Sequence, residues 1–101
     1  MPDHIDTDAV IAQLNDLPRM FEAAHTTRFR CYRKAADGRT QEVTVEIYDS
    51  GPIIEQQDDG QEVETRRYYC IARSDDGKAT SGNSADKVRT VLATVHWEEL
   101  D

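Results

Sequence analysis

Two residues near the end of the sequence have the spacing of paired metal ligands. His96 and Glu99 are three positions apart, and on a helix this spacing places both side chains on one face. An imidazole and a carboxylate are common ligands of divalent metals, and a bound metal can activate water for hydrolysis. One pair does not complete a site, so no catalytic residue, metal or cofactor is predicted. A small metal-dependent enzyme using His96, Glu99 and nearby acids stays open as an alternative.

Arginine, tyrosine and glutamate side chains form a second group of candidate functional residues, which could bind another protein. They alternate with apolar residues along three segments, which would place them together on one side of a sheet. Tyr and Arg are enriched where proteins bind partners. The expected partner-binding residues are Arg28, Arg30, Tyr32, Glu46, Tyr48 and Arg67. A structural interpretation is also open, in which Arg–Glu–Arg pairs across the strands only hold an exposed sheet together.

The balance of charge is acidic, with 20 Asp and Glu residues against 12 Lys and Arg residues and a formal net charge of −8. An acidic surface keeps a small protein soluble or docks on a basic partner. Affinity for a phosphate backbone depends on clustered Lys and Arg. Nucleic-acid binding is therefore disfavoured and is kept as a second alternative, through the basic side of the sheet.

The chain has the length of one domain with one core, and we expect a single domain over residues 1–101. Hydrophobic residues make up 38%, a lean content that suits one sheet with helices on one side and water on the other. No apolar run approaches the roughly 20 residues that span a bilayer, and the start lacks the basic and apolar stretches of a secretory signal. The expected location is the cytoplasm, away from membranes.

The two cysteines do not indicate a metal site, because structural zinc requires four ligands. Cys31 and Cys70 fall in the first and third of the expected strands. The second strand would lie between them and separate them by about 9–10 Å, whereas a disulfide needs Cα atoms within about 7 Å. Both are predicted to be free thiols.

Apolar residues at helical spacing predict a helix in the first part of the chain. It begins at Thr7, with Asp6 or Thr7 as its cap, and its apolar positions form one stripe. A proline then interrupts it. We expect this proline to open a second short helix over Arg19–Ala24, with Met20 and Phe21 pointing inward.

Period-two alternation predicts a hairpin of two strands over residues 27–34 and 41–48, joined by a turn that contains Gly38. Complementary charges and apolar residues suggest its register. The expected partners are Lys34 with Glu42, Arg30 with Glu46, Arg28 with Tyr48, Phe29 with Ile47, and Cys31 with Val45.

A third strand is expected over Glu64–Arg73, followed by a turn and a short edge strand over Lys78–Ser81. The facing of the third strand is ambiguous, because either set of alternating residues could point inward. We favour the facing that places Tyr68, Cys70 and Ala72 in the core, because it sends Arg67 and Arg73 outward beside the acids of the second strand.

A last helix is expected after a cap at Asn83 or Ser84. Its buried stripe would consist of Ala85, Val88, Val91, Leu92 and Val95. Trp97 and Leu100 would then close the end of the core.

These elements define an α+β fold: helix, three- to four-stranded antiparallel meander, helix, with both helices packed on one face. This order, with Asp75-Asp76-Gly77 and then Ser81-Gly82-Asn83-Ser84 opening the last helix, resembles the double-stranded-RNA-binding domain. In that family a lysine cluster at the start of the final helix binds phosphates. Here that position offers Lys87 beside Asp86, so the resemblance implies the topology without the binding residues.

The patterns together predict a small acidic, non-enzymatic protein-binding module, such as an adaptor, inhibitor or modulator. It would use the Arg/Tyr/Glu side of the sheet or its acidic loops. The expected partner is another protein, or a second copy of the same chain in a homodimer.

Overall fold

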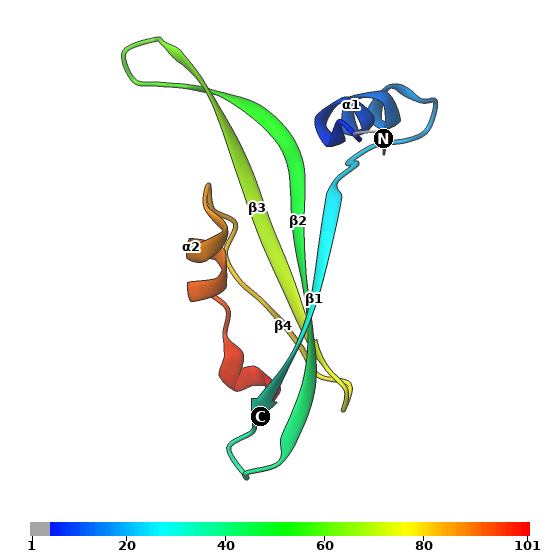
Figure 1. The fold of residues 1–101 in the computed structure, drawn as a ribbon. Helices are drawn as coiled ribbons and strands as arrows, with labels where there is room; N and C mark the ends of the chain where they lie inside the picture. Colours follow the sequence, from blue (N-terminus) through cyan, green and yellow to red (C-terminus); the bar gives the residue numbers. More distant parts are fainter. Residues whose placement is uncertain (1–4) are drawn as a thin grey trace.

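The computed structural model describes residues 5–101, and the expectation about the start of the chain falls partly on residues 1–4, outside this range. Figure 1 shows a long twisted sheet with helical segments that lie apart from one another. The elements are α1 (Thr7–Asp16), β1 (His25–Lys34), β2 (Thr40–Gln56), β3 (Glu62–Ser74), β4 (Ala79–Ser81), α2 (Val88–Ala93) and the short 3-10 helix η1 (Trp97–Leu100). The sheet is antiparallel throughout, in the order β1-β2-β3-β4, which confirms an α+β fold built on a meander.

The β1–β2 hairpin is confirmed, but its predicted register is wrong by two residues. Arg28 pairs with Glu46, Phe29 with Val45, and Tyr32 with Glu42. The turn is tighter than expected: Ala35 N donates to Arg39 O at 2.8 Å, and Gly38 supplies the positive φ that a short turn requires. A shift of two residues changes every partner but leaves each side chain on its predicted side of the sheet.

β2 continues to Gln56, beyond residue 48 where the second strand was expected to end. The pairing with β3 shifts between Asp49 and Pro52, so the strand carries an irregularity there instead of ending. Gly51 has φ +91°, and its α-carbon faces the side chain of Ile11 from α1. This is where α1 packs on the sheet.

The predicted facing of β3 is confirmed. Cys70 and Ala72 are fully buried, and Tyr68 packs against the same cluster. The core lies between β2, β3 and the end of the chain. Its buried members are Val43, Val45, Cys70, Ala72, Val91, Val95 and Leu100.

α1 begins where predicted, and Asp6 is its cap, accepting a hydrogen bond from Ala9 N at 3.2 Å. The second short helix over Arg19–Ala24 is absent, which corrects the prediction. Arg19 and Glu22 both have positive φ, a conformation incompatible with a right-handed helix. Met20 and Phe21 are exposed and do not reach the core.

The last helix is shorter than predicted and begins at Val88, with Lys87 at its N-cap instead of Asn83 or Ser84. Ala85 exchanges two backbone hydrogen bonds with Tyr68, which keeps the chain extended beside β3 and delays the helix. Val91 and Val95 are buried, and Leu100 and Trp97 close the core as expected.

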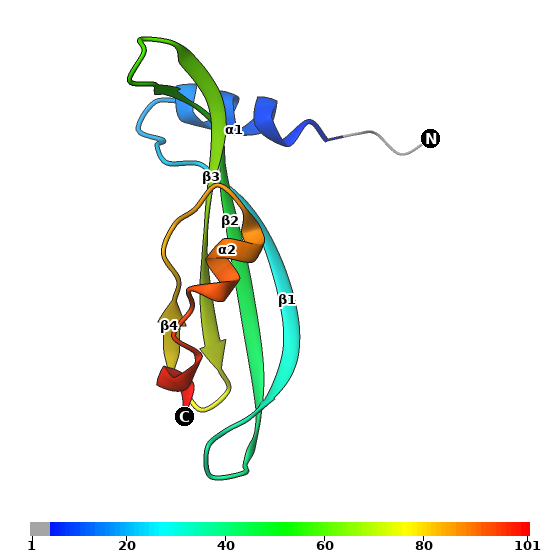
Figure 2. The same cartoon turned by 90° about the vertical axis from the view of Figure 1, so that its left-hand side faces the viewer.

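The two helices contact different strands of the sheet. α2 lies over β3, whereas α1 lies beyond the end of β1 and contacts β2, so the two helices lie at different places along the twisted sheet (Figures 1 and 2). The sheet side that faces α2 is called the inner side here, and the opposite one the outer side. A double-stranded-RNA-binding-domain topology is therefore not confirmed.

Both cysteines are free thiols, as predicted, because β2 separates the strands that carry them. Cys31 is exposed on β1, whereas Cys70 is buried, and burial raises the pKa of its thiol. Among residues 5–101, no helix has the length and apolar character needed to cross a membrane.

A polar network joins η1 to the strand ends. The fully buried Gln41 donates to Leu100 O at 2.5 Å and to Asp76 at 3.2 Å, and accepts from Arg33 at 3.0 Å. Asp101 accepts from Arg33 at 2.6 Å. These bonds satisfy polar groups that would otherwise be buried without partners.

Acid is expected to weaken the fold through this network. The hydroxyl of Ser74, followed by the Arg39 guanidinium 2.8 Å away, lowers the pKa of the Asp76 carboxyl. A lowered folded-state pKa stabilises the fold above the unfolded pKa of about 4, and the contribution is lost as the pH falls below it. We expect the free energy of unfolding to decrease between pH 5 and pH 3 in urea titrations.

The variant Asp76→Asn should be less stable than the parent at pH 7 and should lose less stability in acid. Asp58→Asn, in the exposed turn between β2 and β3, is the matched control and should follow the parent at both pH values. An Asp76→Asn variant with the parent's full acid sensitivity would contradict the assignment.

Candidate functional site

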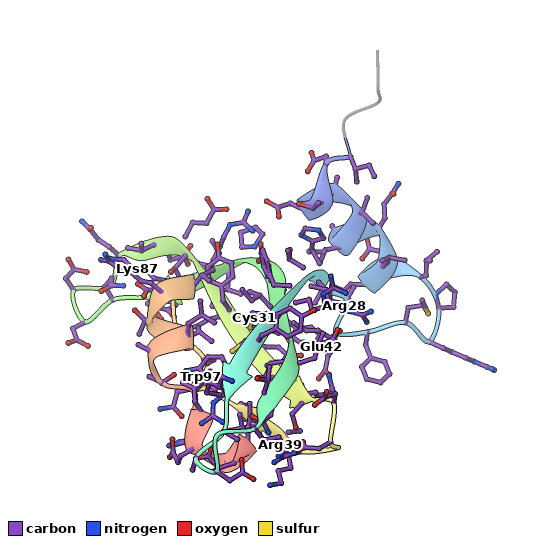
Figure 3. All side chains as sticks on the ribbon, turned by 60° about the horizontal axis from the view of Figure 1, so that its bottom comes forward. Arg28, Cys31, Arg39, Glu42, Lys87 and Trp97 are labelled. Carbon is purple, nitrogen blue, oxygen red and sulfur yellow. The ribbon has the colours of Figure 1, made fainter. Side chains whose placement is uncertain are left out.

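β1 is the strand that carries most of the predicted site, and it forms one edge of the sheet. Nine of its ten residues are exposed, a larger share than in β2 or β3. Figure 3 shows Trp97 on the α2 side of the sheet and Arg28 and Glu42 on the other side. Because side chains alternate along a strand, β1 presents one set of residues to each side.

The outer side gathers the charged residues predicted from the alternation. Glu46 contacts two arginines from its two neighbouring strands, Arg28 on β1 at 3.4 Å and Arg73 on β3. Arg30 lies 3.8 Å from Glu42, so its partner is Glu42 and not the predicted Glu46. Exposed pairs at such distances contribute at most about 1 kcal/mol each, which leaves Arg28 and Arg30 available to other partners.

The tyrosines and Arg67 complete this side. Tyr48 stacks on Tyr69 with ring centroids 4.5 Å apart, and it does not make the predicted contact with Arg28. Arg67 pairs with Glu55 at 3.1 Å, farther along the sheet. Tyr32 is largely exposed. The predicted partner-binding residues thus share one side of the sheet, but they spread over three strands and engage one another.

The inner side holds a feature that the sequence patterns did not reveal: an apolar groove of about 740 Å³ between α2 and the first two strands. Its lining residues are Phe29, Cys31, Val45, Ile47, Val88, Arg89, Leu92, Ala93 and Trp97. A smaller hollow of about 220 Å³ continues it toward His25 and shares Phe29, Ile47 and Val88. The groove follows the inner side of β1.

The groove exists because α2 is too short and too close to β3 to cover β1. Phe29 points to the inner side like the buried Val43 and Val45, yet 54% of its surface is exposed. The alternation places Phe29 and Cys31 on the apolar side of the sheet but does not show whether that side is covered. The signal that could have found the groove is the shortage of long apolar side chains in the last helix.

The two residues proposed as metal ligands have different side-chain partners in the structure. His96 lies at the N-cap of η1, after α2 has ended, and not on the last α-helix as the spacing argument assumed. Glu99 accepts a hydrogen bond from Thr80 at 3.1 Å, and His96 lies 3.6 Å from Glu98. Within residues 5–101, no three side chains of the metal-binding types come together.

Comparison with the models of known protein families, with curated proteins and with solved structures gave no match in any of the three.

Proposed function

We propose that this protein is a small, non-enzymatic protein-binding module whose binding surface is centred on β1. The observation that supports the proposal best is the apolar groove along the inner side of that strand. Concave sites lined mainly by apolar and aromatic side chains are where proteins usually bind other molecules. The outer residues Arg28, Arg30 and Tyr32 extend the surface around the edge of the sheet, toward Glu46, Tyr48 and Arg67.

The extended shape of the protein and its large accessible surface support the proposal that a partner covers part of it. Its radius of gyration is 16.9 Å, whereas a compact domain of this length has about 13 Å. Its accessible surface is 7492 Å², against roughly 5,800 Å² for a compact monomer of this mass. A standard interface covers about 800 Å² on each partner, which the excess can supply.

The composition of the surface favours a protein over a nucleic acid. Glu42, Glu46 and Glu55 lie among the arginines of the outer side, and acids at these positions oppose a phosphate backbone. The groove itself is apolar, as the centres of protein interfaces are.

Replacing Phe29 with alanine is expected to reduce capture of a partner from a lysate of the source organism about tenfold or more. Phe29 would be buried by the partner, and losing a buried phenylalanine typically weakens binding tenfold or more. Phe21→Ala is the matched control, because Phe21 is 78% exposed in the loop after α1, away from the groove. The measurement is quantitative mass spectrometry of proteins retained by each immobilised variant.

A partner retained equally by the parent and by both variants would exclude the groove from the binding surface. Circular dichroism of Phe29→Ala must show the parent's sheet content, because loss of the fold would also abolish capture.

A further inference from the structure

Resting on the proposed function, we infer that the partner binds β1 as an added strand: an extended peptide segment in which apolar and acidic residues alternate. The apolar side chains would enter the groove on the inner side, and the acidic side chains would face the arginines on the outer side. Three features of β1 support this inference: its edge, its inner side and its outer side.

The edge of β1 presents backbone groups at the right positions. Ala35 N donates to Arg39 O, and in an antiparallel ladder hydrogen-bonded pairs alternate with pairs that are not. Phe29 and Cys31 therefore bond to β2, while the N–H and C=O groups of Arg28, Arg30 and Tyr32 point away from it. The 2.9 Å hydrogen bond from Asp75 N to Glu42 O supports this pattern. The backbone groups of Glu42 point toward β3, so the backbone groups of its two neighbours on β2 point toward β1.

The inner side of β1 requires apolar partners. An added strand lies about 4.8 Å from β1 and continues the alternation of the sheet, so every second side chain would fall beside Phe29 and Cys31. From there, branched or aromatic side chains reach the groove bounded by Leu92 and Trp97. Burying Phe29 in this way would remove the most exposed apolar surface that β1 presents on its inner side.

The outer side of β1 requires acidic partners. Three of its residues, Arg28, Arg30 and Lys34, are cationic, and each would lie next to an outward side chain of the added strand. Glu42 and Glu46 on β2 balance them only through long, exposed contacts of 3.8 and 3.4 Å. Opposite charges on neighbouring strands stabilise the pairing, and like charges oppose it.

The same argument disfavours a second copy of this chain at the edge. Pairing β1 with β1 of another molecule would place Arg28, Arg30 and Lys34 of both copies on one side of the joined sheet. Cations on an edge strand are a recognised means of preventing such self-pairing. An acidic strand converts this repulsion into attraction.

Fluorescence anisotropy with labelled synthetic peptides tests the inference on the full chain. The probe is a ten-residue peptide, the length of β1, of alternating glutamate and valine. One control peptide replaces glutamate with lysine, and another replaces valine with serine. We expect the glutamate–valine peptide to bind at least about tenfold more tightly than either control, since both halves of the pattern contribute.

Variants of β1 then test its edge, its inner side and its outer side separately, with two variants outside β1 as controls. Phe29→Ala should weaken the peptide about tenfold, and Arg30→Gln about two- to fivefold, whereas Phe21→Ala and the exposed Arg19→Gln should leave its affinity unchanged. Arg30→Pro should weaken binding beyond Arg30→Gln, because proline removes an edge N–H that β2 does not use. A thermal melt of each variant confirms that it remains folded.

Cysteine labelling gives a second readout that does not depend on the fluorophore. Cys31 lines the groove and is exposed, whereas Cys70 is buried. Saturating glutamate–valine peptide should slow maleimide labelling of Cys31, and neither control peptide should.

Equal binding of all three peptides, or no binding of the glutamate–valine peptide, would overturn the inference. If capture of a protein partner still depends on Phe29 in that case, the proposed function stands and only the added strand is wrong. Self-association in sedimentation that Phe29→Ala abolishes would assign the groove to a second copy and would also overturn the inference. Loss of both peptide binding and Phe29-dependent capture would remove the two proposals together.

Discussion

Leu100→Ala is expected to lower the free energy of unfolding by about 2–5 kcal/mol, the range for truncating a fully buried leucine. The Leu100 side chain has no exposed surface, and it packs in the cluster with Val43 and Val91. The core has few large members, so little surrounding structure can collapse into the cavity. A loss of this size is a large fraction of the 5–15 kcal/mol typical of a whole domain.

Urea denaturation followed by circular dichroism measures this loss. Leu17→Ala is the matched control, because Leu17 is 51% exposed just after α1 and should cost less than about 1 kcal/mol. Equal losses in the two variants would mean that Leu100 does not belong to the core, and the placement of η1 against β4 would then be wrong.

Gly82→Ala is expected to cost about 3 kcal/mol for a different reason. A Cβ atom at Gly82 would overlap the carbonyl oxygen of Val91 and lie 2.9 Å from the Thr94 hydroxyl. Val91 O belongs to the backbone of α2, so the overlap can be relieved only by moving the backbone of the helix or of the residues after β4. Added atoms in a packed site destabilise by about 1–3 kcal/mol, with larger costs where the backbone must move.

The control is Gly60→Ala, in the turn between β2 and β3. A Cβ atom there would meet nothing within 4 Å, but the φ of +84° is unfavourable for alanine and should cost about 1 kcal/mol. Gly82→Ala should therefore shift the urea midpoint clearly more than Gly60→Ala. The reverse order would show that α2 does not pack closely on the residues after β4.

The strands could be predicted because their signal is local. Alternation in residues 27–48 and turn glycines at Gly38, Gly60 and Gly77 determine which segments are extended and where they reverse. The facing of β3 was chosen correctly because it sends Arg67 and Arg73 outward beside the acids of β2. The register of the hairpin was missed because it depends on the turn conformation, which set Ala35 against Arg39 and shifted every pair.

The helical segments were predicted less well because their ends depend on distant contacts. Ala85 is held extended by two backbone hydrogen bonds to Tyr68, and this contact shortens α2. The placement of α1 likewise depends on Gly51, forty residues after Ile11, which packs on it. Neither contact can be predicted from the residues of the helix itself.

The sequence by itself determined the α+β class, the order of the strands along the chain, the two sides of the sheet and the free state of both cysteines. These properties follow from the period of side-chain alternation and from turn residues, which act over a few positions. Only the tertiary structure decided that α2 covers β3 and leaves β1 open, because coverage depends on how far a short helix reaches across a sheet. The groove beside Phe29, and with it the proposed binding surface, exists because α2 does not extend as far as β1.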